Sequence, residues 1–384
     1  MYIINARIHT MIKKNDNFLV INPGFIRIKN KKIIEIGHMS NLNINNNNNY
    51  KIINAQNQEV YPGFIDSHTH LGLYNNGENY DFNDANEINF KICPHLRVLD
   101  GINFFDISFT EALKSGITTV IISPGSASII GGQLAAIKTF GRSLQEIVIN
   151  SNIGIKFSLG ENPRKNSNSF VTRMGIIAKI REILYKSKNY IKNNNTQNFS
   201  LKYESFIPLF ENKIPAYFHV HNTTDILAAI NLSHEFNIKL NLIHATEINK
   251  LHIFSKNNNN FLSNLNIIIG PIITDRSKYE LKNFDINHVK LLKNLKINFG
   301  ISTDHPELPS QYLTLGAHVL NSLGISSDDL IAAITINNAK ICGIDKFVGS
   351  LEINKHADIL IFDKNPVRQF IYPKVVIING EVIK

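Results

Sequence analysis

The chain has 384 residues, of which 43% are hydrophobic, so it can bury the core of one large domain or of two smaller ones. Its net charge is +9, but the lysines are dispersed and form no basic stripe with aromatic residues, which argues against a nucleic-acid partner. No apolar run reaches the ~18 to 20 residues of a membrane span, so no membrane contact is expected either. The first residues lack the pattern of a secretion signal, and Cys93 and Cys342 lie far apart, so we expect a cytoplasmic protein with reduced thiols.

Both ends of the chain are predicted to be rich in β-strands. Alternating or β-branched apolar residues indicate strands at 1–9, 25–28 and 32–37, and again at 357–363 and 375–383. The last of these segments contains an Asn-Gly turn, which is typical of a hairpin. We therefore expect a small β-sandwich domain assembled from residues 1–59 and 346–384.

Residues 60–345 show a different pattern, in which strands alternate with helices. Apolar residues at helical spacing indicate helices at 110–115 and 224–236. Strands that alternate with helices predict a parallel sheet, and about 280 residues of this pattern fit a TIM-like (β/α)8 barrel. The fold class is therefore α/β, with strands predicted at 60–65, 118–123, 154–159, 214–220, 239–244, 266–270 and 296–303.

The most informative motif is His68-Thr-His70, which follows the first predicted barrel strand. In extended backbone, residues i and i+2 point to the same side, so both imidazoles can bind one metal ion. Chemistry in such barrels lies at the carboxyl ends of the strands, which is where this pair falls.

Further strand ends carry residues of the same chemistry. They are Lys156 within an apolar strand, the pair His219-Val-His221, His244, and Asp304. A single buried histidine is usually hydrogen-bonded rather than bound to metal, and a buried lysine usually pairs or extends to the surface. Their coincidence at the strand ends of one predicted barrel favours a shared metal site.

The stretch Pro62-Gly-Phe-Ile-Asp-Ser-His-Thr-His70 resembles the first-strand signature of the amidohydrolase superfamily. The segments 335–340 and 349–361 resemble its return to the terminal domain, and within the superfamily the chain is most similar to imidazolonepropionase-related members. The resemblance implies a divalent metal cofactor, one or two ions per chain, with zinc as the default and iron or manganese as alternatives. The implied metal ligands are His68, His70, Lys156, His219, His244 and Asp304.

The resemblance also implies roles within this set. Lys156 matches a lysine that is carboxylated and bridges two metals in binuclear members, and Asp304 matches an aspartate that binds metal and takes the proton from the attacking water. From the residues alone, Glu161 is the alternative bridging group, because it is a carboxylate only five residues further on. The implied activity is hydrolysis of a C–N bond in a cyclic amide or small peptide-like substrate by a metal-activated water, with Asp304 as proton shuttle.

Three residues are candidates for contact with a small-molecule substrate. His221 can reach the pocket as a catalytic or binding residue or point outward, and Arg276 can pair with a substrate carboxylate or lie on the surface. Gly125 begins a glycine-rich segment that can present backbone N–H groups to an anion or form a plain tight loop.

Two alternatives to the amide hydrolase remain open. The same site can deaminate a ring, and a non-catalytic homologue can keep the barrel for binding or assembly. Every expected ligand position is filled, which disfavours the non-catalytic reading. Assembly into a homo-oligomer also stays open.

Overall fold

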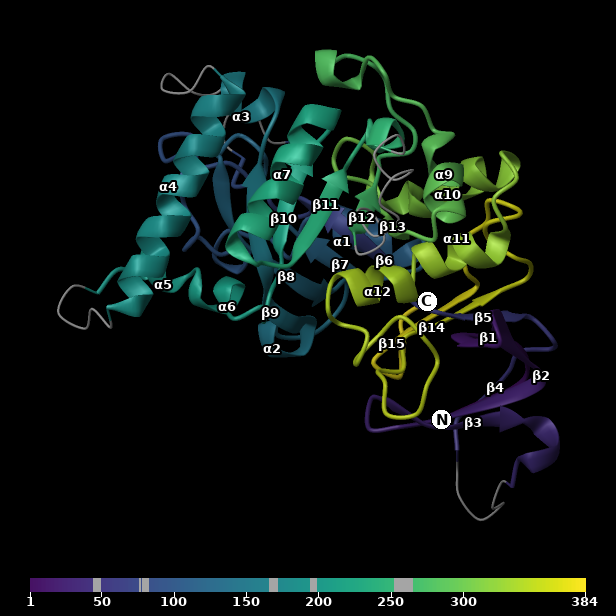
Figure 1. Cartoon of the computed structure of the whole chain (residues 1–384). Helices are drawn as coiled ribbons and strands as arrows, with labels where there is room; N and C mark the ends of the chain where they lie inside the picture. Colours follow the sequence, from purple (N-terminus) through teal and green to yellow (C-terminus); the bar gives the residue numbers. More distant parts are fainter. Residues whose placement is uncertain (44–49, 76, 78–82, 166–171, 194–198, 252–264) are drawn as a thin grey trace.

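The computed structural model describes residues 1–43, 50–75, 77, 83–165, 172–193, 199–251 and 265–384. These residues form two eight-stranded sheets, one from the middle of the chain and one from its two ends (Figure 1). The α/β class and a separate sheet assembled from both termini are thus as the sequence predicts.

The central sheet has the strand order β13-β12-β11-β10-β9-β8-β7-β6 and curls into a nearly closed barrel. Its strands are β6 Phe64–Thr69, β7 Ile117–Ile122, β8 Ile130–Lys138, β9 Val148–Ser158, β10 Ala216–Val220, β11 Leu240–His244, β12 Asn266–Ile269 and β13 Asn298–Ile301.

One strand departs from the predicted (β/α)8 pattern, because β8 runs antiparallel to both β7 and β9. Parallel neighbours need a crossover of a dozen or more residues, and the connection from Ser123 to Ile129 is too short for one. The chain therefore turns back directly, and part of the glycine-rich segment read as a loop becomes the start of β8.

The gap between β6 and β13 is bridged by a side chain. Asn338, in helix α12 (Ile336–Ile341), donates from Nδ2 to Ile65 O at 2.7 Å and to Ile301 O at 2.8 Å. A Cβ at Gly300 would lie 1.7 Å from Asn338 Oδ1, so only glycine leaves room for this amide. Asn338 thus ties the first barrel strand to the last.

Apolar side chains inside the barrel form a core beneath the carboxyl ends of the strands. Ile65, Ile121, Tyr217, Ile243 and Ile268 belong to it, and residues of α12 close it from below. A larger core lies between the sheet and the surrounding helices.

The helices lie mainly outside the barrel, where α4 and α7 pack on each other beside β10 and β11 (Figure 1). No helix of the described residues is long and apolar enough to cross a membrane. Besides α12, the helices are α1 Ile107–Lys114, α2 Leu144–Ile147, α3 Glu161–Lys165, α4 Arg173–Lys192, α5 Leu201–Glu204, α6 Ile207–Phe210, α7 Thr223–Phe236, α9 His288–Asn294, α10 Leu313–Ser322 and α11 Ser327–Ala333. Short 3-10 turns are η1 Met39–Asn41, η3 Val98–Asp100, η4 Ile248–Leu251, η5 Tyr279–Leu281 and η6 Ser310–Tyr312.

The terminal sheet has the order β16-β15-β14-β5-β1-β2-β3, and β4 also pairs with β1. The predicted Asn-Gly turn joins β15 to β16, with φ of +50° at Asn379 and +76° at Gly380, the left-handed geometry that such a turn requires. Hydrogen bonds link all eight strands into one sheet, rather than into the two separate sheets that a sandwich would show. The strands are β1 Tyr2–Lys14, β2 Asn17–Lys29, β3 Lys32–His38, β4 Ile52–Asn54, β5 Glu59–Pro62, β14 Ile359–Phe362, β15 Val375–Ile378 and β16 Glu381–Val382.

A buried ion pair connects the two sheets. Lys138, at the end of β8, pairs with Asp358, just before β14, and their side chains are 1% and 4% exposed. Asp358 also accepts a hydrogen bond at 2.9 Å from the backbone N–H of Asn379.

Candidate metal centre

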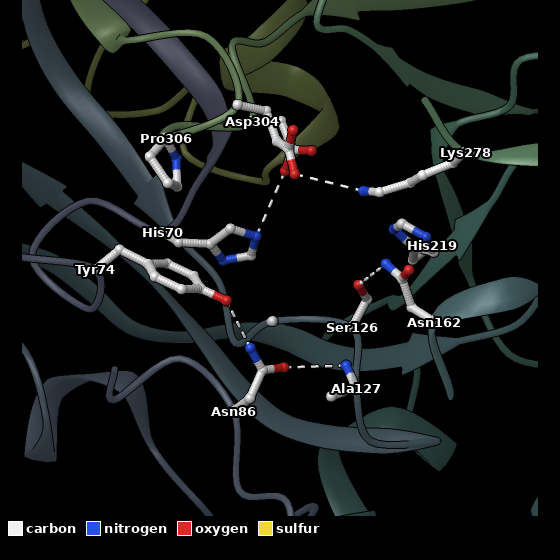
Figure 2. Close-up of a pocket in the computed structure, with 12 residues that line it drawn as sticks. His70, Tyr74, Asn86, Ser126, Ala127, Asn162, His219, Lys278, Asp304 and Pro306 are labelled. Atoms are coloured by element: carbon white, nitrogen blue, oxygen red, sulfur yellow. Dashed lines mark hydrogen bonds and ion pairs between the residues drawn. The ribbon is translucent and has the colours of Figure 1, made fainter. Parts of the chain in front are cut away.

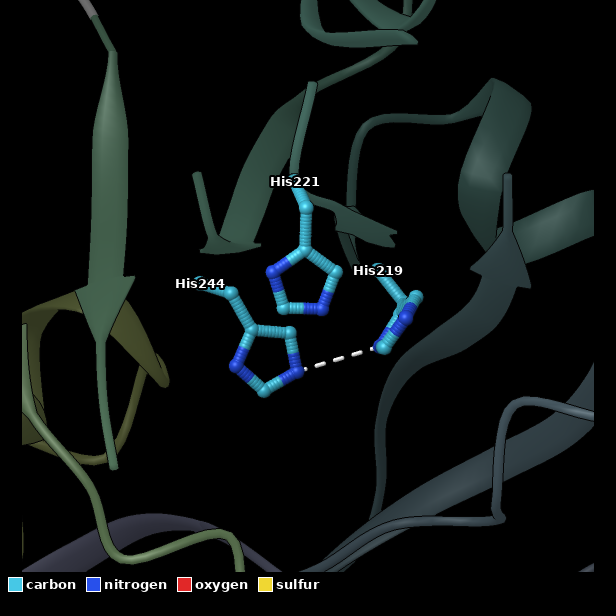
Figure 3. Close-up of side chains that lie close together, drawn as sticks. All are labelled: His219, His221 and His244. Atoms are coloured by element: carbon cyan, nitrogen blue, oxygen red, sulfur yellow. Dashed lines mark hydrogen bonds between the residues drawn. The ribbon is translucent and has the colours of Figure 1, made fainter. Parts of the chain in front are cut away.

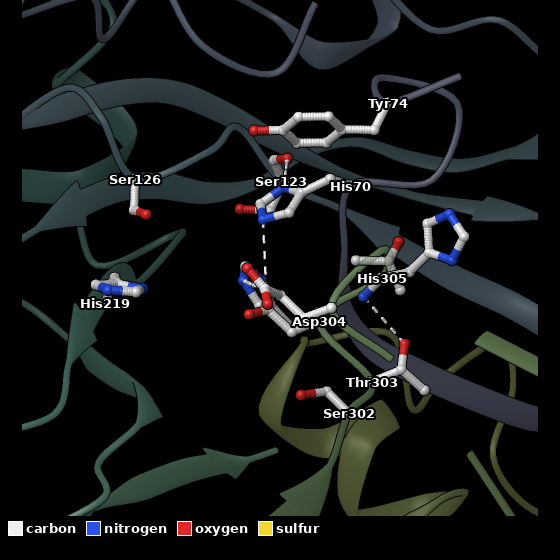
Figure 4. Close-up of polar contacts among 12 residues, drawn as sticks. His70, Tyr74, Ser123, Ser126, His219, Ser302, Thr303, Asp304 and His305 are labelled. Atoms are coloured by element: carbon white, nitrogen blue, oxygen red, sulfur yellow. Dashed lines mark hydrogen bonds and ion pairs between the residues drawn. The ribbon is translucent and has the colours of Figure 1, made fainter. Parts of the chain in front are cut away.

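The meeting of β6 and β13 brings His68 and His70 beside Asp304. The backbone N–H of Asp304 donates to His68 O at 3.0 Å, and that of His70 donates to His305 O at 2.9 Å. The Nε2 atom of His68 lies 3.2 Å from Asp304 Oδ1. That of His70 lies 3.4 Å from the same oxygen (Figure 4). Asp304 has φ of +55°, a left-handed conformation that is uncommon outside glycine and recurs at functional sites.

The next two histidines come from adjacent parallel strands, β10 and β11. His219 Nδ1 lies 3.0 Å from His244 Nε2 (Figure 3), and His244 Nε2 lies 3.8 Å from Asp304 Oδ2. The structure therefore brings together all four histidines and the aspartate that the sequence analysis assigned to one site.

Hydrogen bonds on the outer side of the cluster orient two of these rings. His70 Nδ1 lies 2.7 Å from Ser123 O, and His244 Nδ1 lies 2.6 Å from Gly270 O. Because a carbonyl can only accept, Nδ1 carries the proton in both rings and the lone pair of Nε2 faces the centre. This arrangement is common among histidines that bind metals.

Burial sets the protonation of the cluster. It lowers the pKa of His68 and His219 well below the ordinary 6.5 and also lowers that of His244, which leaves neutral imidazoles at pH 7. Burial by itself raises the pKa of Asp304, but His244 and the contacts with His68 and His70 outweigh it and hold this pKa well below 3.8. Neutral imidazoles and an ionised carboxylate are the forms that bind divalent cations.

Lys156 reaches the same cluster from β9. Its side chain is fully buried, and Nζ lies 3.2 Å from His68 Nε2 and 3.3 Å from Ser123 Oγ. No carboxylate of the described residues lies within 4.0 Å of it, and burial lowers its pKa to about 7 despite the attraction of Asp304. A buried amine with such a pKa is largely uncharged above neutrality, which is the form that can react with carbon dioxide.

His221 also lies in the site, although it is not in the predicted ligand set. Its ring stacks on that of His244 at 4.6 Å with an angle of 10° between planes (Figure 3). Its Nδ1 lies 2.7 Å from Thr246 Oγ1. It is 6% exposed, so the outward-facing alternative does not apply.

Two other predicted residues are not brought to the cluster. Glu161 begins α3 and pairs with Lys165 one turn later, an arrangement that the local helix favours over a bridging role. Arg276 is exposed and donates to Phe284 O at 3.0 Å, because the irregular segment after β12 turns its side chain outward.

A cavity of about 450 Å³ opens above the cluster (Figure 2). Gly125 lines it as predicted, but its N–H donates to Ala85 O at 2.7 Å, and the N–H of Ala127 donates to Asn86 Oδ1 at 3.0 Å. These two amides are therefore engaged and do not form the predicted anion cradle. The lining comprises His70, Tyr74, Asn86, Gly125, Ser126, Ala127, Asn162, His219, Lys278, Asp304, Pro306 and Glu307.

Lys278 is a cationic lining residue that the sequence analysis missed. It lies two residues after Arg276 and lines the wall opposite Tyr74 (Figure 2). Its Nζ pairs with Glu307 Oε1 at 3.4 Å. The presence of a cation in this segment was visible in the sequence, but which of the two faces the cavity depends on the backbone of the segment.

The residues of the cluster fit a divalent metal ion. The described residues contain two groups whose ligand atoms lie within 4.8 Å of one another, namely His68, His70 and Asp304, and His219, His221 and His244. His68 Nδ1 and His219 Nε2 are buried without a hydrogen-bond partner in the described structure. Imidazole nitrogen with carboxylate oxygen suits zinc, and also iron or manganese.

Comparisons with known proteins identify the family of the chain. Residues 60–383 match the model of the amidohydrolase family, and the chain belongs to that family. The crystal structure of an amidohydrolase from Thermotoga maritima is 30% identical, with a TM-score of 0.91 over 100% of this chain and 99% of that one. Members of the superfamily hydrolyse C–N bonds, deaminases included.

Two curated relatives are more distant. An imidazolonepropionase from Picrophilus torridus is 24% identical over 97% of this chain and 94% of its own length, which supports the imidazolonepropionase-related branch. The amidohydrolase tasK from Hapsidospora irregularis is 22% identical over 86% of this chain, which spans only 37% of that relative.

Proposed function

We propose that the protein is a metal-dependent hydrolase that cleaves the C–N bond of a small cyclic or peptide-like amide. The observation that carries the proposal is the position of Asp304, whose two carboxylate oxygens face His68, His70 and His244 at 3.2 to 3.8 Å beneath the cavity. Such a carboxylate sits beside the metal ligands and within reach of a molecule bound above them.

The histidines and Asp304 would hold a divalent metal ion, which would supply Lewis acidity to polarise the amide carbonyl and to acidify water. Asp304 is ionised at neutral pH and accepts the proton of the attacking water. It then passes that proton to the leaving nitrogen as the C–N bond breaks. The buried, neutral histidines add no positive charge that would repel the metal.

Lys156 supports a binuclear site. A fully buried amine with no carboxylate partner among the described residues is unfavourable as an ammonium ion, and carboxylation would convert it into an anion beside His68. In this proposal, the modified Lys156 would be the residue that holds the two metal ions of a binuclear site together.

Lys278 supports an anionic group on the substrate. Its ammonium faces the cavity across from His70, and its bond to Glu307 is long and partly exposed, so a substrate anion can replace it. N-acyl amino acids and cyclic amides with a carboxylate arm fit this description.

The test is Asp304→Asn, assayed on a panel of cyclic amides and N-acyl amino acids. Asparagine is nearly isosteric but cannot accept the proton, so the rate per bound metal should fall about 10²- to 10⁴-fold after metal occupancy is restored. Asp275→Asn is the matched control, because Asp275 is exposed and lies outside the cluster.

A rate within a few-fold of the parent would refute the role of Asp304 and make His221 the next candidate for the base. Release of ammonia from a ring substrate would instead assign the protein to the deaminases.

A further inference from the structure

Glu280 is a buried carboxyl group beside the metal centre that no predicted ligand set includes. It lies in η5, after β12, and only 1% of it is exposed. A carboxyl group so deeply buried needs partners for both of its oxygens.

One oxygen is held by the backbone that follows β9. The N–H of Glu161 donates to Glu280 Oε2 at 2.9 Å. The preceding residue, Gly160, has φ of +88°, and a Cβ there would lie 2.6 Å from the same oxygen. The segment is therefore shaped to receive this carboxyl group and to fix its rotation.

The other oxygen faces the histidines. Glu280 Oε1 has no hydrogen-bond partner in the described structure, and it lies 3.6 Å from His221 Nε2 and 3.9 Å from His219 Nε2. His219 Nε2 is likewise buried and unpartnered among the described residues.

The opposite nitrogens of both rings are engaged elsewhere. His219 Nδ1 faces His244 Nε2 at 3.0 Å, toward the proposed metal, and His221 Nδ1 lies 2.7 Å from Thr246 Oγ1. A metal ligand must keep its lone pair on the metal side, so the proton of His219 belongs on Nε2, which points at Glu280.

We infer that Glu280 is a positioning residue that accepts the Nε2–H of His219 and thereby holds the Nδ1 lone pair toward the metal, an inference that rests on the proposed metal-dependent function. The contact closes from 3.9 Å to hydrogen-bond length when the site is loaded, as polar contacts in ligand-free sites often do. A carboxylate on the outer nitrogen of a metal-binding histidine fixes its tautomer and strengthens metal binding.

The sharpest variant is Glu280→Gln. The N–H of Glu161 needs an acceptor, so the amide oxygen takes the Oε2 position and the NH₂ group faces His219. Two donors, the NH₂ group of the glutamine and the Nε2–H of His219, would then face each other. This contact favours the other tautomer of His219, with the proton on Nδ1. Metal affinity, measured by chelator competition, should then fall about 10- to 100-fold.

Tautomers are read directly by ¹⁵N NMR of histidine-labelled protein, with the His219 signals assigned from their loss in His219→Gln. The expected result is Nε2–H in the parent and a shift toward Nδ1–H in Glu280→Gln. Glu211→Gln, which removes an exposed carboxylate outside the cavity, should change neither tautomer nor affinity.

If the NMR signals of the parent protein show the His219 proton on Nδ1, the inference is overturned. This result needs no variant, so it decides the question even if Glu280→Gln does not fold. An unchanged affinity in Glu280→Gln would also overturn it. Complete loss of one metal equivalent at saturating zinc would show that Glu280 is itself a ligand, which again refutes a positioning role. Neither readout needs a substrate, so the inference can fail while Asp304→Asn still behaves as proposed.

Discussion

Removal of the buried lysine that joins the two sheets should be strongly destabilising. Lys138 and Asp358 are 1% and 4% exposed, and Lys138→Met leaves Asp358 with only the N–H of Asn379 as a described hydrogen-bond donor. Removing one partner of a buried ion pair destabilises a protein by about 3 to 5 kcal/mol, because the charge of the other partner stays buried without a counter-charge. At roughly 2 °C per kcal/mol, the melting temperature should fall by about 6 to 10 °C.

The assay is thermal and urea unfolding of the metal-free protein, followed by far-ultraviolet circular dichroism. The double variant Lys138→Met with Asp358→Leu should recover most of the loss, since an apolar pair of similar volume often replaces a buried ion pair without penalty. Lys346→Met, at an exposed turn position, is the control and should stay within about 0.5 kcal/mol of the parent. A loss below about 1 kcal/mol for Lys138→Met, or no recovery in the double variant, would refute the reasoning.

Three further outcomes are expected. Lys278→Met should lower kcat/KM about 10- to 100-fold for anionic substrates and leave kcat/KM for neutral substrates nearly unchanged. The control Arg276→Met should stay within two-fold of the parent for both kinds of substrate. Equal losses on anionic and neutral substrates in Lys278→Met would contradict a contact between Lys278 and a substrate anion. Lys156→Met should bind one equivalent of metal where the parent, given bicarbonate and excess metal, binds two; one equivalent in both proteins would exclude the bridging role. Burial lowers the pKa of His356 to about 4, with Lys138 adding to the effect. As the pH falls, His356 is therefore protonated in the unfolded chain at a higher pH than in the folded chain. The stability that this histidine contributes above pH 6.5 is lost as the pH falls toward 4. Allowing for the partial exposure of His356, the free energy of unfolding of the parent should fall by about 1 to 2 kcal/mol more than that of His356→Gln over this pH range. The same pH dependence of unfolding in both proteins would contradict the prediction.

The residues of the candidate metal centre were predictable because each is signalled locally. His68, His70, His219, His244 and Asp304 each follow a short apolar run, and a polar residue at the end of a buried strand is visible without any knowledge of the fold. Strand direction in a parallel sheet then places these ends together.

The missed features depend on packing between segments distant in sequence. Gly131 and Gly132 interrupt the apolar pattern at the start of β8, so this strand read as a loop. Glu280 lies in a polar stretch without periodicity, and its burial involves Gly160 and the N–H of Glu161, which come from a segment more than 100 residues earlier in the chain. The choice of Lys278 over Arg276 as the cavity cation likewise follows from an irregular backbone that no residue pattern specifies.

The terminal sheet also constrains how the chain can fold during synthesis. β14 pairs with β5, yet about 300 residues separate them in sequence. At roughly 5 to 20 residues per second, the ribosome needs about 15 to 60 seconds to produce this partner strand. Throughout that time Val60 and the apolar face of β1 lack the residues of β14 and β15 that later bury them. An open strand edge of this kind is prone to pair with other chains, so the first sixty residues are where a nascent-chain chaperone would have to act.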